Sequence, residues 1–105
     1  MLILIAGITG LIGLPCARAA IAQGHKVRGI ARSAGKLPKE VRDQLESFEP
    51  MVGLHDIAAM DRAVAGVDAI ICALAGLPEM FLETQVLLLR AAERAGVKVR
   101  YKVQR

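Results

Sequence analysis

The chain has 105 residues, enough for one domain, and 54% of them are hydrophobic while 23% are charged, which is typical of a protein with a buried core and excludes a disordered chain. The formal net charge is +4 and only 3% of the residues are aromatic, so we do not expect a surface that stacks nucleic-acid bases. Two cysteines without a CxxC spacing are too few for a disulfide framework and do not form a zinc motif.

The first residues do not have the pattern of a secretory signal, because Met1 leads directly into the apolar segment LILIA with no basic residues before it. The longest apolar stretch, residues 67–77, contains Asp68 and is shorter than the ~18 residues that a membrane span needs. We therefore expect a cytoplasmic protein that does not enter a membrane.

Short apolar runs alternate with Ala-rich helical stretches along the chain. In chain order, the sequence predicts a strand at 1–6, a helix at 11–23, a strand at 25–31, a helix at 38–45, a weak strand at 47–52, a short helix at 57–64, a strand at 68–74, a helix at 79–95 and a strand at 97–103. Strands that alternate with helices at this spacing predict an α/β fold, a parallel sheet with right-handed crossovers.

Three of the predicted helices end in the same way, with a glycine followed by a run rich in Val and Ile. These glycines are Gly24, Gly66 and Gly96. A glycine in this position adopts the left-handed conformation that ends a helix at low cost, because it has no Cβ atom. The three segments therefore indicate the helix-to-strand half of a repeated βα unit.

The apolar pattern of the predicted strands indicates their order in the sheet. The segments LILIA and AIICAL are continuous apolar runs, as expected for central strands with helices on both faces. The last strand alternates instead, with Val97, Val99, Tyr101 and Val103 on one side and polar residues on the other, which predicts an edge strand. We expect a doubly wound parallel sheet in the order 3-2-1-4-5, with self-association through this edge strand as one option.

The segment LILIAGITGLIG joins the first predicted strand to the first predicted helix and has a GxxGxxG spacing. Gly7 permits a tight turn off the strand, Gly10 lets the backbone approach a pyrophosphate, and Gly13 lets the helix pack closely on the sheet. Free N–H groups near Leu11 and Ile12 then face the phosphates at the positive end of the helix dipole. The alternative is that the glycines serve only a tightly packed turn.

Basic residues are frequent around the end of the second predicted strand, and they are Lys26, Arg28, Arg32, Lys36, Lys39 and Arg42. Binding of NAD through the ribose 2′-hydroxyl requires an acidic residue at this strand end, but the first carboxylate after it is Glu40. The position holds Arg32 instead, and a guanidinium can bind the 2′-phosphate of NADP(H) in a bidentate manner. The sequence therefore favours NADP(H) over NAD(H); the alternative is that Arg32 is an ordinary solvated charge.

Four segments together resemble the NmrA-like and isoflavone-reductase-like family: AGITGLIG, RSAGK, HDIAAMDRAVAGVDAIICALAG and ERAGVK. Its members are atypical short-chain dehydrogenase/reductase relatives with an NADP-binding Rossmann domain, and the resemblance covers the N-terminal third of a usual member. It implies that the glycine loop, with Thr9, holds the pyrophosphate of NADP(H) and that Arg32 binds the 2′-phosphate with help from Lys36. It also implies that Asp56 lies near the adenine and that Ala73 and Leu74 line the adenosine side.

The same resemblance limits what the chain does alone, because later segments of the family supply the substrate site and a catalytic lysine. Tyr101 and Lys102 are adjacent, so they are not the Tyr-xxx-Lys pair of ordinary short-chain dehydrogenases. We expect residues 1–105 to be an incomplete, C-terminally truncated NAD(P)-binding Rossmann-like domain of an oxidoreductase, with the dinucleotide as partner, no metal, and a small-molecule substrate only if the missing part is supplied. The alternatives are a non-enzymatic NADP(H)-sensing regulator and, ranked last, a nucleic-acid-binding module.

Overall fold

The computed structural model describes residues 1–10, 13–32, 34–52, 56–73, 78–97 and 99–102, with the backbone alone for residues 34, 78–85 and 99–102. In chain order the elements are β1 (Leu2–Ala6), α1 (Gly13–Ala22), β2 (Lys26–Ala31), the 3-10 helix η1 (Ala34–Lys36), α2 (Lys39–Arg42), β3 (Ser47–Pro50), α3 (Ile57–Val64), β4 (Ala69–Cys72), α4 (Pro78–Ala95) and β5 (Val99–Lys102). The described strands form one parallel sheet in the order β3-β2-β1-β4-β5. The predicted fold class and strand order are confirmed.

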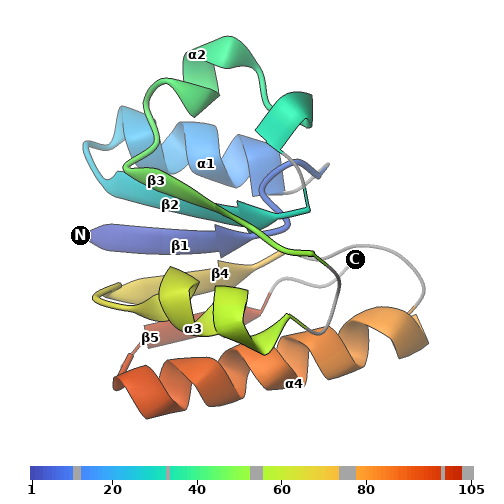
Figure 1. Cartoon of the computed structure of the whole chain (residues 1–105). Helices are drawn as coiled ribbons and strands as arrows, with labels where there is room; N and C mark the ends of the chain where they lie inside the picture. Colours follow the sequence, from blue (N-terminus) through green and yellow to red (C-terminus); the bar gives the residue numbers. More distant parts are fainter. Residues whose placement is uncertain (11–12, 33, 53–55, 74–77, 98, 103–105) are drawn as a thin grey trace.

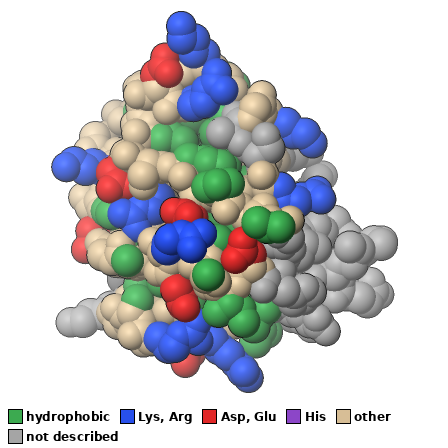
Figure 2. Space-filling view, viewed as in Figure 1, with side chains coloured by type: hydrophobic (Ala, Val, Ile, Leu, Met, Phe, Trp, Pro, Cys, Tyr) green, Lys and Arg blue, Asp and Glu red, His purple; other side chains and the backbone are tan. Residues whose placement is uncertain are grey.

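The helices form a layer on each face of this sheet (Figure 1). α1 and α2 pack on one face, and α3 and α4 pack on the other. A right-handed crossover places its helix on one face when the chain moves one way across the sheet and on the opposite face when it moves back. The chain moves from β1 through β2 to β3 and then returns across the sheet to β4 and β5. The helices α1 and α2 therefore lie on one face, and α3 and α4 lie on the other. Acidic and basic side chains are interspersed over the surface of the α3 and α4 side (Figure 2).

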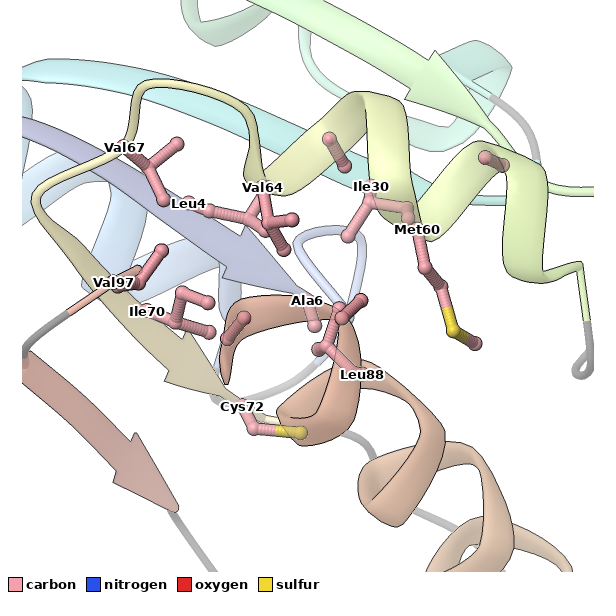
Figure 3. Packing of buried hydrophobic residues seen from close by; sticks show 14 of the residues in the cluster. Leu4, Ala6, Ile30, Met60, Val64, Val67, Ile70, Cys72, Leu88 and Val97 are labelled. Carbon is pink, nitrogen blue, oxygen red and sulfur yellow. The ribbon is translucent and has the colours of Figure 1, made fainter. Parts of the chain in front are cut away.

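The strand side chains alternate between two buried clusters. The α3/α4 cluster lies between the sheet and helices α3 and α4 and includes Leu4, Ala6, Ile30, Met60, Val64, Ile70, Cys72 and Leu88 (Figure 3). The α1/α2 cluster lies on the other face and includes Ile3, Ile5, Ile8, Ala17, Val27, Ala31, Val41 and Ala69. Consecutive residues of β1 and β4 therefore enter opposite clusters, which explains why both strands are continuous apolar runs.

The three glycines at helix ends adopt the predicted conformation. Their φ angles are 85° at Gly24, 74° at Gly66 and 76° at Gly96. After α1, the N–H of His25 donates to the carbonyl of Ala20 at 3.1 Å, a bond that reaches five residues back across the helix end. The chain thus leaves each helix and enters the next strand within a few residues.

The second helix differs from the prediction. The expected helix at 38–45 is reduced to α2 (Lys39–Arg42), because the N–H groups of Gln44 and Leu45 donate to carbonyls three residues back instead of four, at 3.0 and 3.4 Å. The 3-10 helix η1 was not predicted. The other elements agree with the predicted ranges to within two residues at each end.

β3 and β5 form the two edges of the sheet, which confirms the edge position predicted for the last strand. β3 has four residues and ends at Pro50, after which the N–H of Met51 donates to the carbonyl of Ala31 on β2 at 2.9 Å. Val97 lies before β5 and packs in the α3/α4 cluster. The side chains of the remaining predicted stripe, Val99, Tyr101 and Val103, lie outside the described part of the chain.

Arg28 joins three elements near the end of the sheet where the strands begin. Its guanidinium donates to the Glu46 carboxylate at 3.0 and 3.2 Å, to the Ser47 hydroxyl at 2.9 Å, and to the carbonyls of Ala63 and Ala65 at 2.8 and 2.7 Å. The Arg28 side chain is only 14% exposed. The hydrogen bonds from Arg28, and then from Ser47, lower the pKa of the Glu46 carboxyl below its ordinary value. One side chain thus connects β2, the start of β3 and the end of α3.

In the part of the chain that the structure describes, no helix is long and apolar enough to cross a bilayer. Among the same described residues, no three His, Cys, Asp or Glu side chains gather as metal ligands would. Cys72 is buried, and Cys16 on α1 is partly buried.

Candidate functional site

The residues predicted to form the site follow the carboxyl ends of four neighbouring strands. Because the strands are parallel, these ends lie along the same edge of the sheet. Backbone hydrogen bonds hold the segments there together, from Gly7 to Ile30 at 3.2 Å and from Ala73 to Ala6 at 2.9 Å. The strand order reverses between β1 and β4, and open α/β sheets bind their ligands outside the strand ends at such a reversal.

The glycine loop turns sharply after β1 and leads into α1. Gly7 has a φ of 76°, which side chains with a Cβ rarely adopt, and this confirms its predicted part in a tight turn. The N–H of Gly10 donates to the carbonyl of Gly7 at 3.0 Å, and the N–H of Leu14 donates to the carbonyl of Gly10 at 3.1 Å. The first bond closes the turn within the loop, and the second connects the loop to α1.

Gly13 begins α1 directly against the loop. A Cβ atom on Gly13 would overlap the carbonyl oxygen of Gly7 and would lie 2.8 Å from its carbonyl carbon. The helix thus begins in close contact at Gly13, but the contact is with the backbone of the loop and not, as predicted, with the sheet. A Cβ on Gly10 would lie 3.2 Å from the same oxygen, so this position is also tight. Thr9 is half-buried, and the predicted site residues Leu11 and Ile12 lie outside the described residues.

Ile8 is a residue of this loop whose part was not predicted. Its side chain is fully buried in the α1/α2 cluster, although it lies between the glycines of the turn. A Cβ on Gly29 of β2 would lie 2.9 Å from Cδ1 and 3.0 Å from Cγ2 of Ile8, and 3.2 Å from Cδ2 of Phe48. The one sequence signal for this contact is a glycine inside an otherwise regular strand.

The end of β2 presents basic side chains to solvent. Arg32, the first residue after β2, and Lys36, the last residue of η1, are both exposed, and neither side chain has an ion pair or hydrogen bond within the described part of the chain. Glu40, the nearest carboxylate that follows, is paired with Arg18 at 2.8 Å. This corner of the site therefore favours an anion.

Asp56 caps the N-terminus of α3. Its Oδ1 accepts the N–H of Ala59 at 3.1 Å and its Oδ2 accepts the N–H of Val52 at 3.0 Å, so the carboxylate joins the segment after β3 to the helix. These bonds, that from Val52 first, lower the pKa of the Asp56 carboxyl. The capping part was not predicted. A contact with adenine stays a prediction, as does the part of Ala73, which is buried after β4; Leu74 lies outside the described residues.

Two apolar side chains near Asp56 are exposed, which the sequence analysis did not expect. Val52 is 96% exposed and Ile57 is 47% exposed. Both lie at the edge where the strands end, beside the segment that joins β3 to α3. No sequence signal marks these two residues as exposed, because apolar residues at the ends of strands and helices have the same pattern as core residues.

Comparisons with known proteins identify a family and several solved structures that are similar to this chain. A family model described as NAD(P)H-binding matches residues 7–101. The chain is similar to a short-chain dehydrogenase/reductase superfamily protein from Agrobacterium tumefaciens with bound NAD, at 27% identity and a TM-score of 0.78 over 97% of this chain and 32% of that one. It is similar to an isoflavone reductase at 28% identity and a TM-score of 0.70, over 94% and 34% of the two chains. A search of curated proteins finds no match.

A double mutant of NmrA is similar in fold, at 24% identity and a TM-score of 0.82 over 96% of this chain and 32% of that one. The fold implied by the resemblance is thus confirmed, and the family model and the isoflavone reductase confirm that the resemblance is to NAD(P)H-binding proteins of this kind. The chain spans about a third of the length of these three structures.

Proposed function

Because the chain belongs to the NAD(P)H-binding family whose model matches residues 7–101, we propose that it binds NADP(H) in preference to NAD(H) along the edge where β1, β2, β3 and β4 end. The observation that carries the proposal is Arg32, which is exposed directly after β2 and has no carboxylate partner among the described residues. A guanidinium at this position can pair with a 2′-phosphate, whereas a carboxylate there would accept a hydrogen bond from the 2′-hydroxyl of NAD.

The charge around Arg32 supports the same preference. Lys36 is exposed four residues further on, and no Asp or Glu occurs between Arg32 and Lys39. Glu40 is already held by Arg18. A dianionic phosphate near Arg32 therefore meets positive charge that is not neutralised by a neighbouring carboxylate.

The remaining contacts are proposed from the resemblance in the sequence. The glycine loop would hold the pyrophosphate, through Gly7, Thr9, Gly10, Leu11, Ile12 and Gly13. The adenosine would lie toward Asp56, Ala73 and Leu74. The exposed apolar side chains of Val52 and Ile57 supply a surface against which an adenine ring can pack. Support for the loop comes from its geometry, because it lies between the end of β1 and the start of α1 and folds closely on itself, with no room for a Cβ atom at Gly13.

We also propose the activity of a whole protein that contains this domain, which is that of an oxidoreductase. A bound nicotinamide supplies hydride transfer, and the residues of this chain would bind and orient the dinucleotide for it. We assign no catalytic residue to the chain. A cytoplasmic location and self-association through β5 stay predictions of the sequence analysis.

The proposal is tested by titrating the purified chain with NADPH and NADH side by side, in the wild type and in Arg32→Ala. We expect the wild type to bind NADPH more tightly. Arg32→Ala is expected to weaken NADPH binding roughly 10- to 100-fold, the loss typical of hydrogen bonds to a charged group, with little change for NADH.

The matched control is Arg90→Ala, which changes the net charge by the same amount. Arg90 is an exposed residue of α4, which packs on the face of the sheet opposite α1 and α2. It is expected to leave both affinities unchanged. Equal binding of the two nucleotides by the wild type would refute the NADP(H) preference. An equal loss for both nucleotides in Arg32→Ala would show that the guanidinium does not read the 2′-phosphate.

A further inference from the structure

The side chain of Ile8 attaches the glycine loop to the core. Of the loop side chains that the structure describes, Ile8 is fully buried, while Thr9 beside it is half-buried. Ile8 packs in the α1/α2 cluster, on the same face of the sheet as Ile3 and Ile5 of β1. The position of Ile8 therefore determines how deeply the loop lies on the sheet.

The surface under Ile8 is made by a glycine in the middle of a strand. Gly29 lies in β2 in register with Ile5 of β1 on one side and Phe48 of β3 on the other. A glycine in a strand interior weakens the strand, and it commonly marks a place where another group approaches the backbone. Here the approaching group is Ile8, since two of its carbon atoms lie within 3.0 Å of the place where a Gly29 Cβ would be.

We propose that Gly29 is a positioning residue of the dinucleotide site, which sets the depth of the glycine loop by leaving room for the Ile8 side chain. This inference rests on the proposed function, in which the loop binds the pyrophosphate. It adds a residue that does not touch the ligand and that lies on a neighbouring strand.

A methyl group at Gly29 would press on Cδ1 and Cγ2 of Ile8, so this side chain must shift, and in this proposal the loop backbone shifts with it. The Ile8 side chain is fully buried, and packed interiors accommodate added atoms by shifting the backbone. Gly7 precedes Ile8, and its carbonyl accepts the Gly10 N–H and contacts Gly13 too closely for a Cβ. A shift of Ile8 therefore reaches both the turn and the first residue of α1.

The first test measures the nucleotide affinity of Gly29→Ala by calorimetry, well below its unfolding temperature. We expect weaker binding of NADPH and NADH by a similar factor, roughly tenfold, because both nucleotides share the pyrophosphate. Arg32→Ala acts differently, since its effect is confined to NADPH. Unchanged affinities in folded Gly29→Ala would overturn the inference.

The second test needs no nucleotide and so separates this inference from the proposed function. Hydrogen–deuterium exchange is measured at the Gly10 and Leu14 amides, whose hydrogen bonds hold the loop. We expect faster exchange at both amides in Gly29→Ala than in the wild type. If the wild type binds neither nucleotide, the proposed function fails, while unchanged exchange in Gly29→Ala would contradict the positioning of the loop.

The matched control is Gly24→Ala, which adds the same methyl group at a positive φ with no atom within 4 Å, at the end of α1. It is expected to lower stability without changing either affinity or loop exchange. A loss of affinity in Gly24→Ala equal to that in Gly29→Ala would show a general effect of instability and contradict the inference.

The contact itself is tested in the Ile8→Ala background. Ile8→Ala removes both Cδ1 and Cγ2 and leaves Phe48 Cδ2, at 3.2 Å, so adding Gly29→Ala to it is expected to cause a much smaller loss of affinity and loop protection than Gly29→Ala causes alone. If Gly29→Ala alone does not fold, the double variant is expected to fold as Ile8→Ala does. Full additivity of the two changes, or a double variant that also fails to fold, would overturn the inference.

Discussion

Arg28 connects β2, the start of β3 and the end of α3 through a guanidinium that is largely buried. Without it, the carbonyl oxygen of buried Ala63 loses a donor, which is costly, and the more exposed Ala65 carbonyl and Glu46 carboxylate lose the hydrogen bonds that connect them to β2. We expect Arg28→Ala to lower the free energy of unfolding by about 2–4 kcal/mol, measured by urea denaturation.

Arg94→Ala is the control for this variant. Arg94 also pairs with a carboxylate, that of Asp61, but its side chain is 54% exposed and makes a single contact between α4 and α3. Exposed ion pairs contribute less than about 1 kcal/mol. Equal losses of stability in the two variants would contradict the distinction between them.

At this scale the sequence could not separate Arg28 from Arg32. Both belong to the same group of basic residues, and the local pattern predicts a solvated or anion-binding role for each. The prediction for Arg32 relied on its position at the end of a strand, which the structure confirms. The role of Arg28 depends on the end of α3, which lies far along the chain and reaches Arg28 only in the folded sheet.

At the scale of an element, α3 depends on its N-cap. Asp56 binds the N–H groups of Val52 and Ala59, so it both caps the helix and fixes the segment before it. We expect Asp56→Ala to lower the melting temperature by a few degrees, and Asp56→Asn to lower it less, because the amide oxygen of asparagine can still accept the Ala59 N–H while its NH2 group cannot accept the Val52 N–H. Thermal unfolding followed by circular dichroism measures both.

An Asp56→Asn variant as unstable as Asp56→Ala would show that the cap on the Ala59 N–H contributes little, and that the charge or the bond from Val52 supports α3. The same two variants also test the predicted contact with adenine. A loss of NADPH affinity in Asp56→Asn at unchanged stability would support that contact.

Elements were predicted best where pattern and punctuation agreed. The strands β1 and β4 are continuous apolar runs, and the helix-ending glycines mark the starts of the next strands. The extent of α2 could not be predicted, because the segment after Asp43 has helical composition but its hydrogen bonds change to a three-residue spacing. Local sequence does not distinguish these two spacings.

At the scale of the whole molecule, the pKa values of Glu46 and Asp56 make stability depend on pH. Both are lowered in the folded protein, by hydrogen bonds from Arg28 and Ser47 and from the Val52 and Ala59 backbone, respectively. Stability that comes from a lowered carboxyl pKa is complete above the ordinary value and is lost as the pH falls through the lowered one. We expect the urea midpoint to change little between pH 7 and about pH 5 and to fall below that.

Glu46→Gln and Asp56→Asn are each expected to reduce the slope of this fall, because neither amide titrates. Urea denaturation at several pH values between 7 and 3 measures it. A slope that is the same in both variants as in the wild type would show that other groups cause the loss.

The strand order was predictable from the sequence because buried and edge strands differ in their apolar pattern. The glycine loop was predictable for the same kind of reason, since its spacing lies between a strand and a helix. Its attachment to the core was not, because Ile8 and Gly29 belong to different strand–helix units and meet only when β1 and β2 pair. Contacts of this kind follow from the register of the sheet.

The proline at the end of β3 gives the sheet one direction in which it can grow. Successive N–H groups of a strand point to opposite sides, and that of Met51 points to β2, so an N–H at Pro50 would face the open edge. Proline has none, and a strand added beside β3 meets a gap in its hydrogen bonding. β5 contains no proline between Val99 and Lys102. Enlargement of the sheet, by a longer polypeptide or a second molecule, is thus favoured at β5, which leaves the surroundings of Arg32 unchanged.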